Sequence, residues 1–286
     1  MKVVRVPSNL PNPPHYQNVL ELADVSVVES CTQAHSTRKV MFLEDHLLLF
    51  VLDGVFKIKL GTREFEVKKN EMILLQKYSS IETWKQGNPD SDYAFESMMF
   101  FIKDSFLLEF LKTEAIHLFK SHATVPVFVR PFKDRLLKFL ESLKPYFRDQ
   151  EEVNANLFRI KMLELLYDLV HTDKNLLLQL IQLKTKYRTD IPKVMEENYL
   201  NPVSLKELAY LSGRSLSSFR RDFETIYNEL PAKWIQERRL RKAKELLALT
   251  EMNVTEVCYA VGYENISHFS RLYKSFWGCS PSEHRT

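Results

Sequence analysis

The sequence reads SLKELAYLSGRSLSSFRRDFETIYNELP over residues 204–231, and a stretch of the same design, NVTEVCYAVGYENISHFSRLYKSFWGCSP, occupies residues 253–281. Both stretches open with a helix-capping residue that is followed three positions later by a glutamate. The pairs are Ser204 with Glu207 and Asn253 with Glu256. In such a capping box the first side chain accepts a hydrogen bond from a free backbone N–H, and the carboxylate reaches back to the cap. Each stretch therefore predicts a helix that begins at the same point.

A glycine and a second helix follow in both copies. Gly213 and Gly262 each lie six residues after the glutamate, where a turn needs a residue free to take positive φ. The next helix carries aromatic residues four apart, which places them on one buried face: Phe219 with Phe223, and Phe269 with Tyr273. Each helix should stop near a residue that tolerates the left-handed conformation, Asn228 or Gly278, ahead of Pro231 or Pro281. Two copies with matched spacing favour a pair of helix-turn-helix units over a purely structural helical repeat.

A long helix is expected between the copies, over Ala232–Leu249, with Pro231 in its first turn. Its inner face is apolar and comprises Trp234, Ile235, Leu240, Ala243 and Leu247. Its outer face is basic and comprises Arg238, Arg239, Arg241, Lys242 and Lys244. A helix of this length would hold the two units at one separation.

Residues 190–286 resemble the DNA-binding domain of the AraC/XylS family of bacterial regulators. The resemblance is carried by Leu208-Ala209, Gly213 and Phe219–Phe223, and by the stretch Val261–Arg285. Four positions depart from the family pattern: Cys258 stands for alanine, Tyr263 and Tyr273 for phenylalanine, and Asn228 for glycine. The resemblance implies a transcriptional regulator with double-stranded DNA as partner. It also implies activation through contact with RNA polymerase, and it leaves repression open.

Outward side chains of a recognition helix reach base edges in the major groove. With the aromatic pairs facing inward, the candidate DNA-binding residues are Ser217, Arg220 and Arg221 in the first unit and Ile266, Ser267, His268, Arg271 and Lys274 in the second. Arginine pairs bidentately with guanine, whereas Lys274 is expected to meet a phosphate. For Ile266 the alternatives are a thymine methyl or packing at the helix start, and for His268 the alternative is a surface side chain without a role. The two units should enter successive major grooves about one turn (~10 bp) apart.

The N-terminal part reads as short strands broken by turns. The expected strands are Asp24–Ser30, Val40–Phe42, His46–Leu52, Phe56–Leu60, Glu64–Val67, Met72–Leu75 and Ala94–Ile102, after an irregular proline-rich arm over residues 1–20. The stretches Val51–Ile58 and Phe65–Leu75 resemble the cupin-like β-barrel sensor domains of the same family. That resemblance implies effector binding or dimerisation. Trp84, Phe42, Phe50, Phe65 and Tyr78 either line a ligand chamber or fill the barrel core.

Amphipathic helices are expected after residue 103. Their apolar faces are Phe106, Leu107, Phe110 and Leu111; then Leu136, Leu137, Leu140 and Leu143; then Leu157, Ile160, Leu163, Leu166 and Val170. The latter two helices should flank Pro145, with polar Asp149–Asn156 between them. They either form a homodimer interface or pack on their own barrel.

The predicted fold class is α+β: a cupin-like barrel with helices over residues 1–180, then an all-α double helix-turn-helix domain over residues 186–286. The N-terminal domain would sense a small molecule or a protein partner, or dimerise.

Other function classes find little support. The barrel offers only His35 and His46 and no His-x-His, so we expect no metal, no cofactor and no enzyme activity. Cys31, Cys258 and Cys279 are odd in number and far apart, which predicts free thiols. The longest apolar run, Leu47–Leu52, is too short to cross a bilayer, so we expect a cytoplasmic protein without membrane association.

Overall fold

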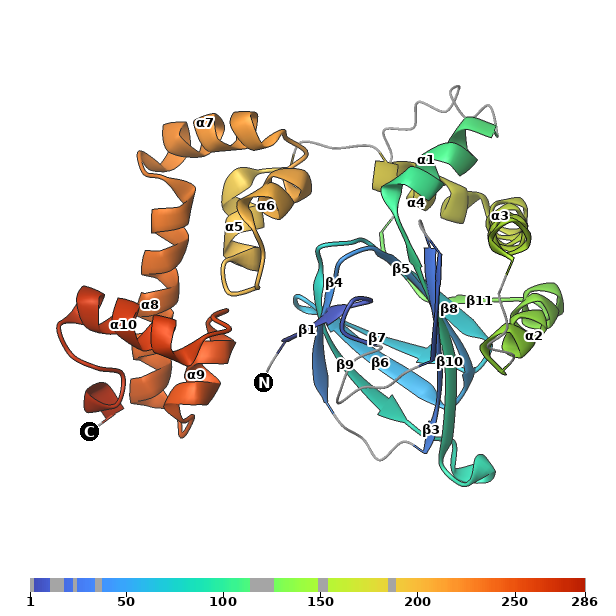
Figure 1. Ribbon diagram of the computed structural model, residues 1–286, viewed down its shortest axis with the longest axis horizontal. Helices are drawn as coiled ribbons and strands as arrows, with labels where there is room; N and C mark the ends of the chain where they lie inside the picture. Colours follow the sequence, from blue (N-terminus) through green and yellow to red (C-terminus); the bar gives the residue numbers. More distant parts are fainter. Residues whose placement is uncertain are drawn as a thin grey trace. The chain divides into compact units, whose positions relative to one another are not determined.

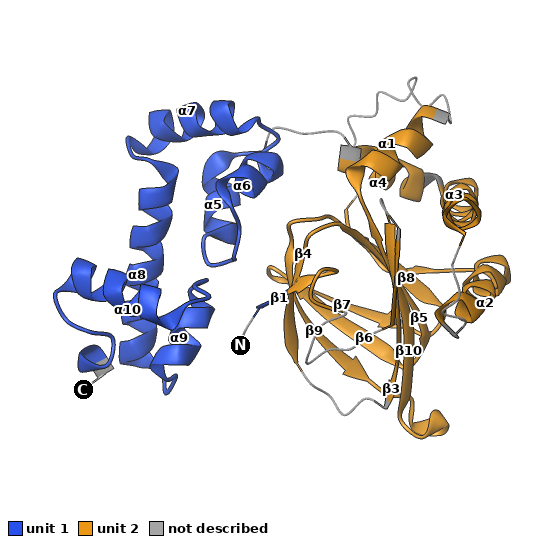
Figure 2. Cartoon of the chain, viewed as in Figure 1, with its two compact units in different colours: residues 1–4, 186–286 blue, residues 5–185 orange. Residues whose placement is uncertain are grey.

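The computed structural model describes residues 3–10, 18–22, 25–33, 38–113, 126–148, 154–184 and 189–285. The chain divides into two compact units, residues 5–185 and residues 186–286 together with residues 1–4 (Figure 2). Within the described ranges, no helix has the length and apolarity that crossing a lipid bilayer would require. The fold is α+β, with a β-rich N-terminal unit and a helical C-terminal unit (Figure 1).

The N-terminal unit contains two antiparallel sheets. The strands are β1 Val3–Val6, β2 Asn18–Leu22, β3 Val25–Gln33, β4 Lys39–Leu43, β5 His46–Asp53, β6 Val55–Leu60, β7 Arg63–Lys68, β8 Glu71–Leu75, β9 Ser80–Gln86, β10 Ala94–Ile102 and β11 Arg130–Pro131. One sheet has the order β1-β4-β9-β6-β7 and the other the order β11-β8-β5-β10-β3-β2. Phe56 of the first sheet packs against Phe95 of the second, with 5.8 Å between ring centroids. Large buried side chains thus occupy the space between the sheets.

All seven predicted strands form, but the sequence missed others. The stretch 1–20 is not wholly irregular, because β1 pairs with β4 and β2 pairs with β3. Strand β9 was missed because its inward alternation includes Thr83, a polar residue that is only 2% exposed and whose hydroxyl donates to the Lys39 carbonyl. A strand is predicted from apolar residues at every second position, and the buried Thr83 interrupts that pattern in β9.

In the described part of this unit, four helices follow β10: α1 Asp104–Thr113, α2 Asp134–Arg148, α3 Ala155–Thr172 and α4 Lys174–Lys184. They cover one face of the six-stranded sheet, and their apolar side chains form one buried cluster with those of β3, β5, β8 and β10 (Figure 1). Phe50 belongs to this cluster and packs edge-on against Phe100 and Phe132, at 5.6 and 5.3 Å between centroids. Phe50 therefore lies on the helix side of its sheet and does not line a barrel chamber. Strand β5 is buried on both faces, which explains its unbroken apolar run.

Two helix predictions need correction. Pro145 does not end a helix; it lies inside α2, which continues to Arg148 although proline has no N–H to donate to the carbonyl of Glu141. The apolar face predicted for α3 is rotated, because the helix buries Phe158, Met162 and Leu165 along with Leu166 and Val170. Leu157 and Ile160 remain 47% and 62% exposed.

A buried polar cluster joins β5 to the start of α1. His46 Nδ1 accepts from the Lys77 backbone N–H at 3.2 Å, so Nε2 carries the proton and donates to Asp104 Oδ1 at 2.9 Å. Lys77 Nζ donates to Asp104 Oδ2 at 2.7 Å. Burial, which disfavours the imidazolium, outweighs the neighbouring carboxylate and lowers the pKa of His46. Burial opposes ionisation of Asp104, but the hydrogen bonds from His46 and Lys77 prevail and lower its pKa to about 2.

We predict that acidification destabilises the N-terminal unit through His46. Because the folded pKa lies below the unfolded value, the stabilisation is complete above pH ~6.5 and is lost as pH falls toward the folded pKa. Thermal unfolding midpoints measured by circular dichroism should fall between about pH 7.5 and about pH 5.5. His46→Gln should lower the midpoint at the upper pH and flatten this dependence. His171→Gln, at an exposed histidine on α3, should keep the wild-type slope. Equal slopes for His46→Gln and wild type would contradict the assignment.

The C-terminal unit contains α5 Ile191–Asn198, α6 Leu205–Leu211, α7 Leu216–Tyr227, α8 Pro231–Leu249, α9 Val254–Ala260 and α10 Ile266–Trp277. Both predicted capping boxes form, at the starts of α6 and α9. Asn228 and Gly278 end α7 and α10 in the left-handed conformation, as the sequence predicted. The structure thus confirms two helix-turn-helix units, α6–α7 and α9–α10, joined by α8.

Candidate nucleic-acid interface

Helix α7 turns a polar face outward because its apolar face is buried in the core. Ser215 caps the helix by accepting from the Ser218 backbone N–H. Phe219 and Phe223 are completely buried in the core around the first helix-turn-helix unit. Ser217, Arg220 and Arg221 are all exposed on this helix, together with Glu224 and Thr225.

The two arginines of α7 differ in their surroundings. Asp222 is held by Arg214, whose Nε donates to Asp222 Oδ2 at 3.0 Å and whose Nη1 donates to the carbonyls of Thr189 and Ser212. This hydrogen bond lowers the pKa of Asp222. Arg221 Nη2 lies 3.5 Å from the other oxygen of the same carboxylate. Arg221 is therefore drawn to a carboxylate of its own helix, whereas no ion pair of Arg220 is found among the described residues.

Helix α10 repeats the arrangement. Asn265 caps it by accepting from the His268 backbone N–H at 2.8 Å, and Phe269 and Tyr273 are completely buried. The five predicted residues of this helix, Ile266, Ser267, His268, Arg271 and Lys274, are all exposed. The His268 ring lies edge-on to Tyr263 of the preceding turn, with 6.1 Å between centroids.

Charge around these helices is partly neutralised within the unit. Lys233 lies 3.0 Å from Glu229 and 3.7 Å from Glu237, so two carboxylates that would repel phosphates are paired. The basic face of α8 is smaller than predicted, because Arg239 is turned inward and its guanidinium donates to backbone carbonyls. Lys244 lies over the Trp277 ring at 4.2 Å. The candidate interface therefore offers a few exposed cations rather than a broad basic surface.

One group in the N-terminal unit has metal-ligand chemistry. Pairing of β3 with β10 places Cys31 opposite Glu96, and the ligand atoms of Glu29, Cys31 and Glu96 lie within 4.8 Å of one another. Lys144 Nζ lies 2.6 Å from Glu96 Oε1, so an ammonium group already neutralises part of this charge. The spacing of these residues along the sequence gave no sign of the cluster, which depends on strand register.

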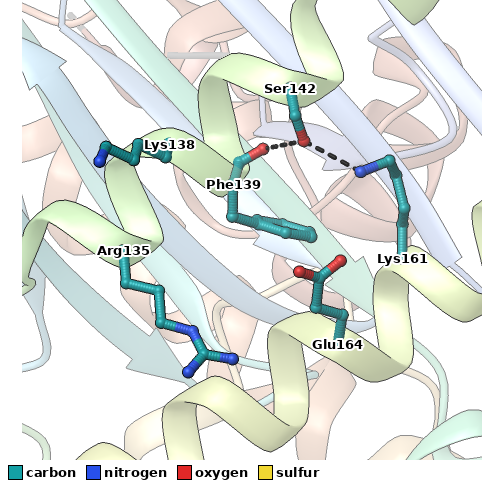
Figure 3. A pocket seen from close by; sticks show the side chains of 6 residues that line it. All are labelled: Arg135, Lys138, Phe139, Ser142, Lys161 and Glu164. Atoms are coloured by element: carbon teal, nitrogen blue, oxygen red, sulfur yellow. Dashed lines mark hydrogen bonds between the residues drawn. The ribbon is translucent and has the colours of Figure 1, made fainter.

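A surface pocket of about 460 Å³ lies between α2 and α3 (Figure 3). It is lined by Arg135, Lys138, Phe139, Ser142, Lys161 and Glu164. Lys161 Nζ donates to Ser142 Oγ at 3.0 Å, and Ser142 Oγ donates to the Phe139 carbonyl at 2.7 Å. Arg135 lies 2.7 Å from Asp168. Much of the polar lining is thus already engaged within the protein.

Comparison with known families assigns both units. Residues 208–286 match the family model described as a helix-turn-helix domain, and residues 46–181 match the ExsA N-terminal regulatory domain. The class of protein that these two matches indicate is a helix-turn-helix transcriptional regulator, here with one helical unit joined to a β-rich unit.

Curated relatives agree with this class. The virulence regulon transcriptional activator VirF of Yersinia enterocolitica is 36% identical over 95 residues, which are 33% of this chain and 35% of that protein. The HTH-type transcriptional regulator ExsA of Pseudomonas aeruginosa is 31% identical over 104 residues, or 36% of this chain and 37% of ExsA. The match thus spans about a third of the length of these relatives. Among solved structures, ToxT of Vibrio cholerae bound to an unsaturated fatty acid is 12% identical with a TM-score of 0.41, covering 93% of this chain and 96% of ToxT. The chain is thus similar to transcriptional regulators of the AraC family, with one match over residues 208–286 and another over residues 46–181.

We predict that Arg220→Ala and Arg271→Ala each weaken binding to a specific site by about 1–3 kcal/mol, because each removes a base-reading guanidinium. Binding to random DNA should change far less. The measurement is a titration of labelled specific and random duplexes at fixed salt. Arg241→Ala, at an exposed arginine of α8, should leave the ratio of specific to random affinity unchanged. Equal losses on both duplexes would reduce Arg220 and Arg271 to phosphate contacts.

Proposed function

We propose that the protein binds double-stranded DNA sequence-specifically and regulates transcription, with α7 and α10 in two successive major grooves. The observation that carries this proposal is that both helices leave a polar, capped and exposed face opposite a fully buried aromatic pair. The residues proposed to contact DNA are Ser217, Arg220, Arg221, Ile266, Ser267, His268, Arg271 and Lys274. Activation at promoters through RNA polymerase is the mode we propose, since the relative VirF is named a transcriptional activator.

The test is selection of binding sites by the full-length protein from a random duplex pool at near-physiological salt. We expect enrichment of two short elements about one helical turn (~10 bp) apart, because two reading helices in one unit would meet successive major grooves. Affinity for the enriched site should fall as salt rises, since each neutralised phosphate releases counterions. Enrichment of a single element would contradict the use of both helices, and no enrichment would contradict specific reading.

For the N-terminal unit we propose regulation through self-association or a bound effector, with self-association favoured. Two observations support this choice. Large side chains such as Phe56 and Phe95 pack against each other between the sheets, which leaves less room for a ligand chamber. On α3, the apolar residues Leu157 and Ile160 are 47% and 62% exposed, although the helix packs its other face on the sheet. Exposed apolar groups on one helix face are typical of an interaction surface.

We predict that Ile160→Glu converts a dimer to a monomer and weakens binding to a two-copy operator, because a charge cannot be buried unpaired at an apolar interface. Sedimentation velocity over a range of protein concentrations measures the first effect. Leu249→Glu, at an exposed leucine of the other unit, should leave the sedimentation profile unchanged. A wild-type protein that stays monomeric at all concentrations would leave the effector alternative as the surviving role.

A further inference from the structure

The C-terminal unit has two separate hydrophobic cores. The first contains Ile191, Val194, Met195, Leu208, Ala209, Phe219, Phe223, Trp234 and Ile235. The second contains Leu240, Ala243, Leu247, Val257, Cys258, Val261, Phe269 and Tyr273. Helix α8 contributes Trp234 and Ile235 to the first core and Leu240 to the second, so it passes from one core to the other. We call the parts of the unit built around the first and the second core its first and second halves. Apart from α8 itself, only contacts where these two halves meet can hold them in a fixed arrangement.

Arg239 lies at this junction, between the residues that α8 gives to each core. Its Nε donates to the Tyr199 carbonyl at 2.6 Å, and its Nη2 donates to the Asn201 carbonyl. Both carbonyls belong to the loop between α5 and α6, in the first half. Its Nη1 donates to the Gly262 carbonyl at 2.9 Å, in the turn that precedes α10. One planar guanidinium therefore bridges the α5–α6 loop of the first half and the α9–α10 turn of the second helix-turn-helix unit.

The bridge is closely packed. The guanidinium lies over the Tyr263 ring at 5.5 Å, and Leu200 of the α5–α6 loop packs against the second core. Gly262 has a φ of +82°, and a Cβ at this position would lie 2.4 Å from the Leu200 carbonyl oxygen and 2.9 Å from Arg239 Cζ. The loop, the arginine and the turn thus meet without room for one additional carbon atom.

The partners of Arg239 are unusual for a partly buried cation. Among the described residues its recorded hydrogen bonds go to three carbonyls and none to a carboxylate. Withdrawing a guanidinium from water is costly, and a carboxylate would repay more of that cost than carbonyl dipoles do. Two of the three carbonyls belong to the first half and one to the second half. The rigid, forked guanidinium can donate to all three at once, which suits it to connect the halves.

We propose that Arg239 is a positioning residue that holds α7 and α10 at one separation and rotation, and so sets which spacing between two DNA elements the protein accepts. This inference rests on the proposed function. Inserting one base pair moves one element by about 3.4 Å along the axis and turns it by about 35°. A hydrogen bond is lost when its donor and acceptor lie more than about 3.5 Å apart, so the Arg239 bridge would break if the two halves followed that movement. While the bridge is intact, the two halves should therefore accept only one spacing between the DNA elements.

The test uses full-length protein and duplexes that carry both selected elements at the selected spacing, or with one or two base pairs inserted or removed. Wild type should lose about tenfold or more in affinity when the spacing changes by one base pair, which is the size of a mismatched contact. For Arg239→Met the same change should cost less than about threefold, because released halves can adjust. Affinity for a duplex with a single element should stay near the wild-type value.

Arg238→Met is the matched control. Arg238 lies on the same helix, but it pairs with Glu196 of α5 and stacks on Trp234, both in the first half. This variant should keep the wild-type spacing profile. Arg239→Lys keeps the charge without the fork and should also flatten the profile, and it serves as the readout if thermal unfolding shows that Arg239→Met is not folded.

The outcomes separate the inference from the proposed function. A wild-type spacing profile in both Arg239 variants, or a wild-type protein indifferent to spacing, would overturn the positioning role while specific binding stands. Absence of sequence-specific binding by wild type would overturn the proposed function, and the inference with it. A flattened profile in the Arg239 variants alone is the result that supports it.

Discussion

Complete burial of one aromatic pair on each recognition helix is the constraint on which the interface depends. Phe219 and Phe223 on α7, and Phe269 and Tyr273 on α10, are 0% exposed. A helix with one face fixed in a core must turn the opposite face outward, and that face carries the arginines. Side-chain caps at Ser215 and Asn265 set where each helix begins, and left-handed residues Asn228 and Gly278 set where each ends. The orientation of the proposed reading side chains thus follows from packing rather than from their own contacts.

The repeat could be predicted from sequence because its signals are local. A capping box, a glycine turn and an aromatic pair at spacing four all act within one helical turn, and each recurs at matched distances. The strands were predicted for the same reason wherever apolar residues alternate or run together, as in β5. Their outer faces were harder to predict, since Phe50 packs against helices that come fifty and more residues later. The prediction from sequence was wrong at Thr83 and at Pro145. Whether a threonine is buried in a strand, and whether a helix continues past a proline, depends on tertiary contacts that the local sequence does not contain.

Arg239 shows what the sequence could not give. Within a run of basic residues on α8 it was indistinguishable from Arg238 and Arg241, and all three were assigned to solvent. Its acceptors are backbone carbonyls of residues 23 to 40 positions away, and every residue type has such a carbonyl. The Glu29, Cys31 and Glu96 cluster was hidden for a related reason, because strand register brings it together. For the eight candidate DNA-binding residues, the structure shows that each is exposed and which residues lie beside it. Their contact with bases stays a prediction.

We propose that α7 and α10 of one unit read two major-groove elements on one face of DNA. Methylation interference at guanine N7, which lies in the major groove, tests this most directly on a selected site bound by the full-length protein. We expect two patches of interference about one helical turn (~10 bp) apart on the same face of the duplex. A single patch, or binding that methylation of the major groove leaves untouched, would contradict it.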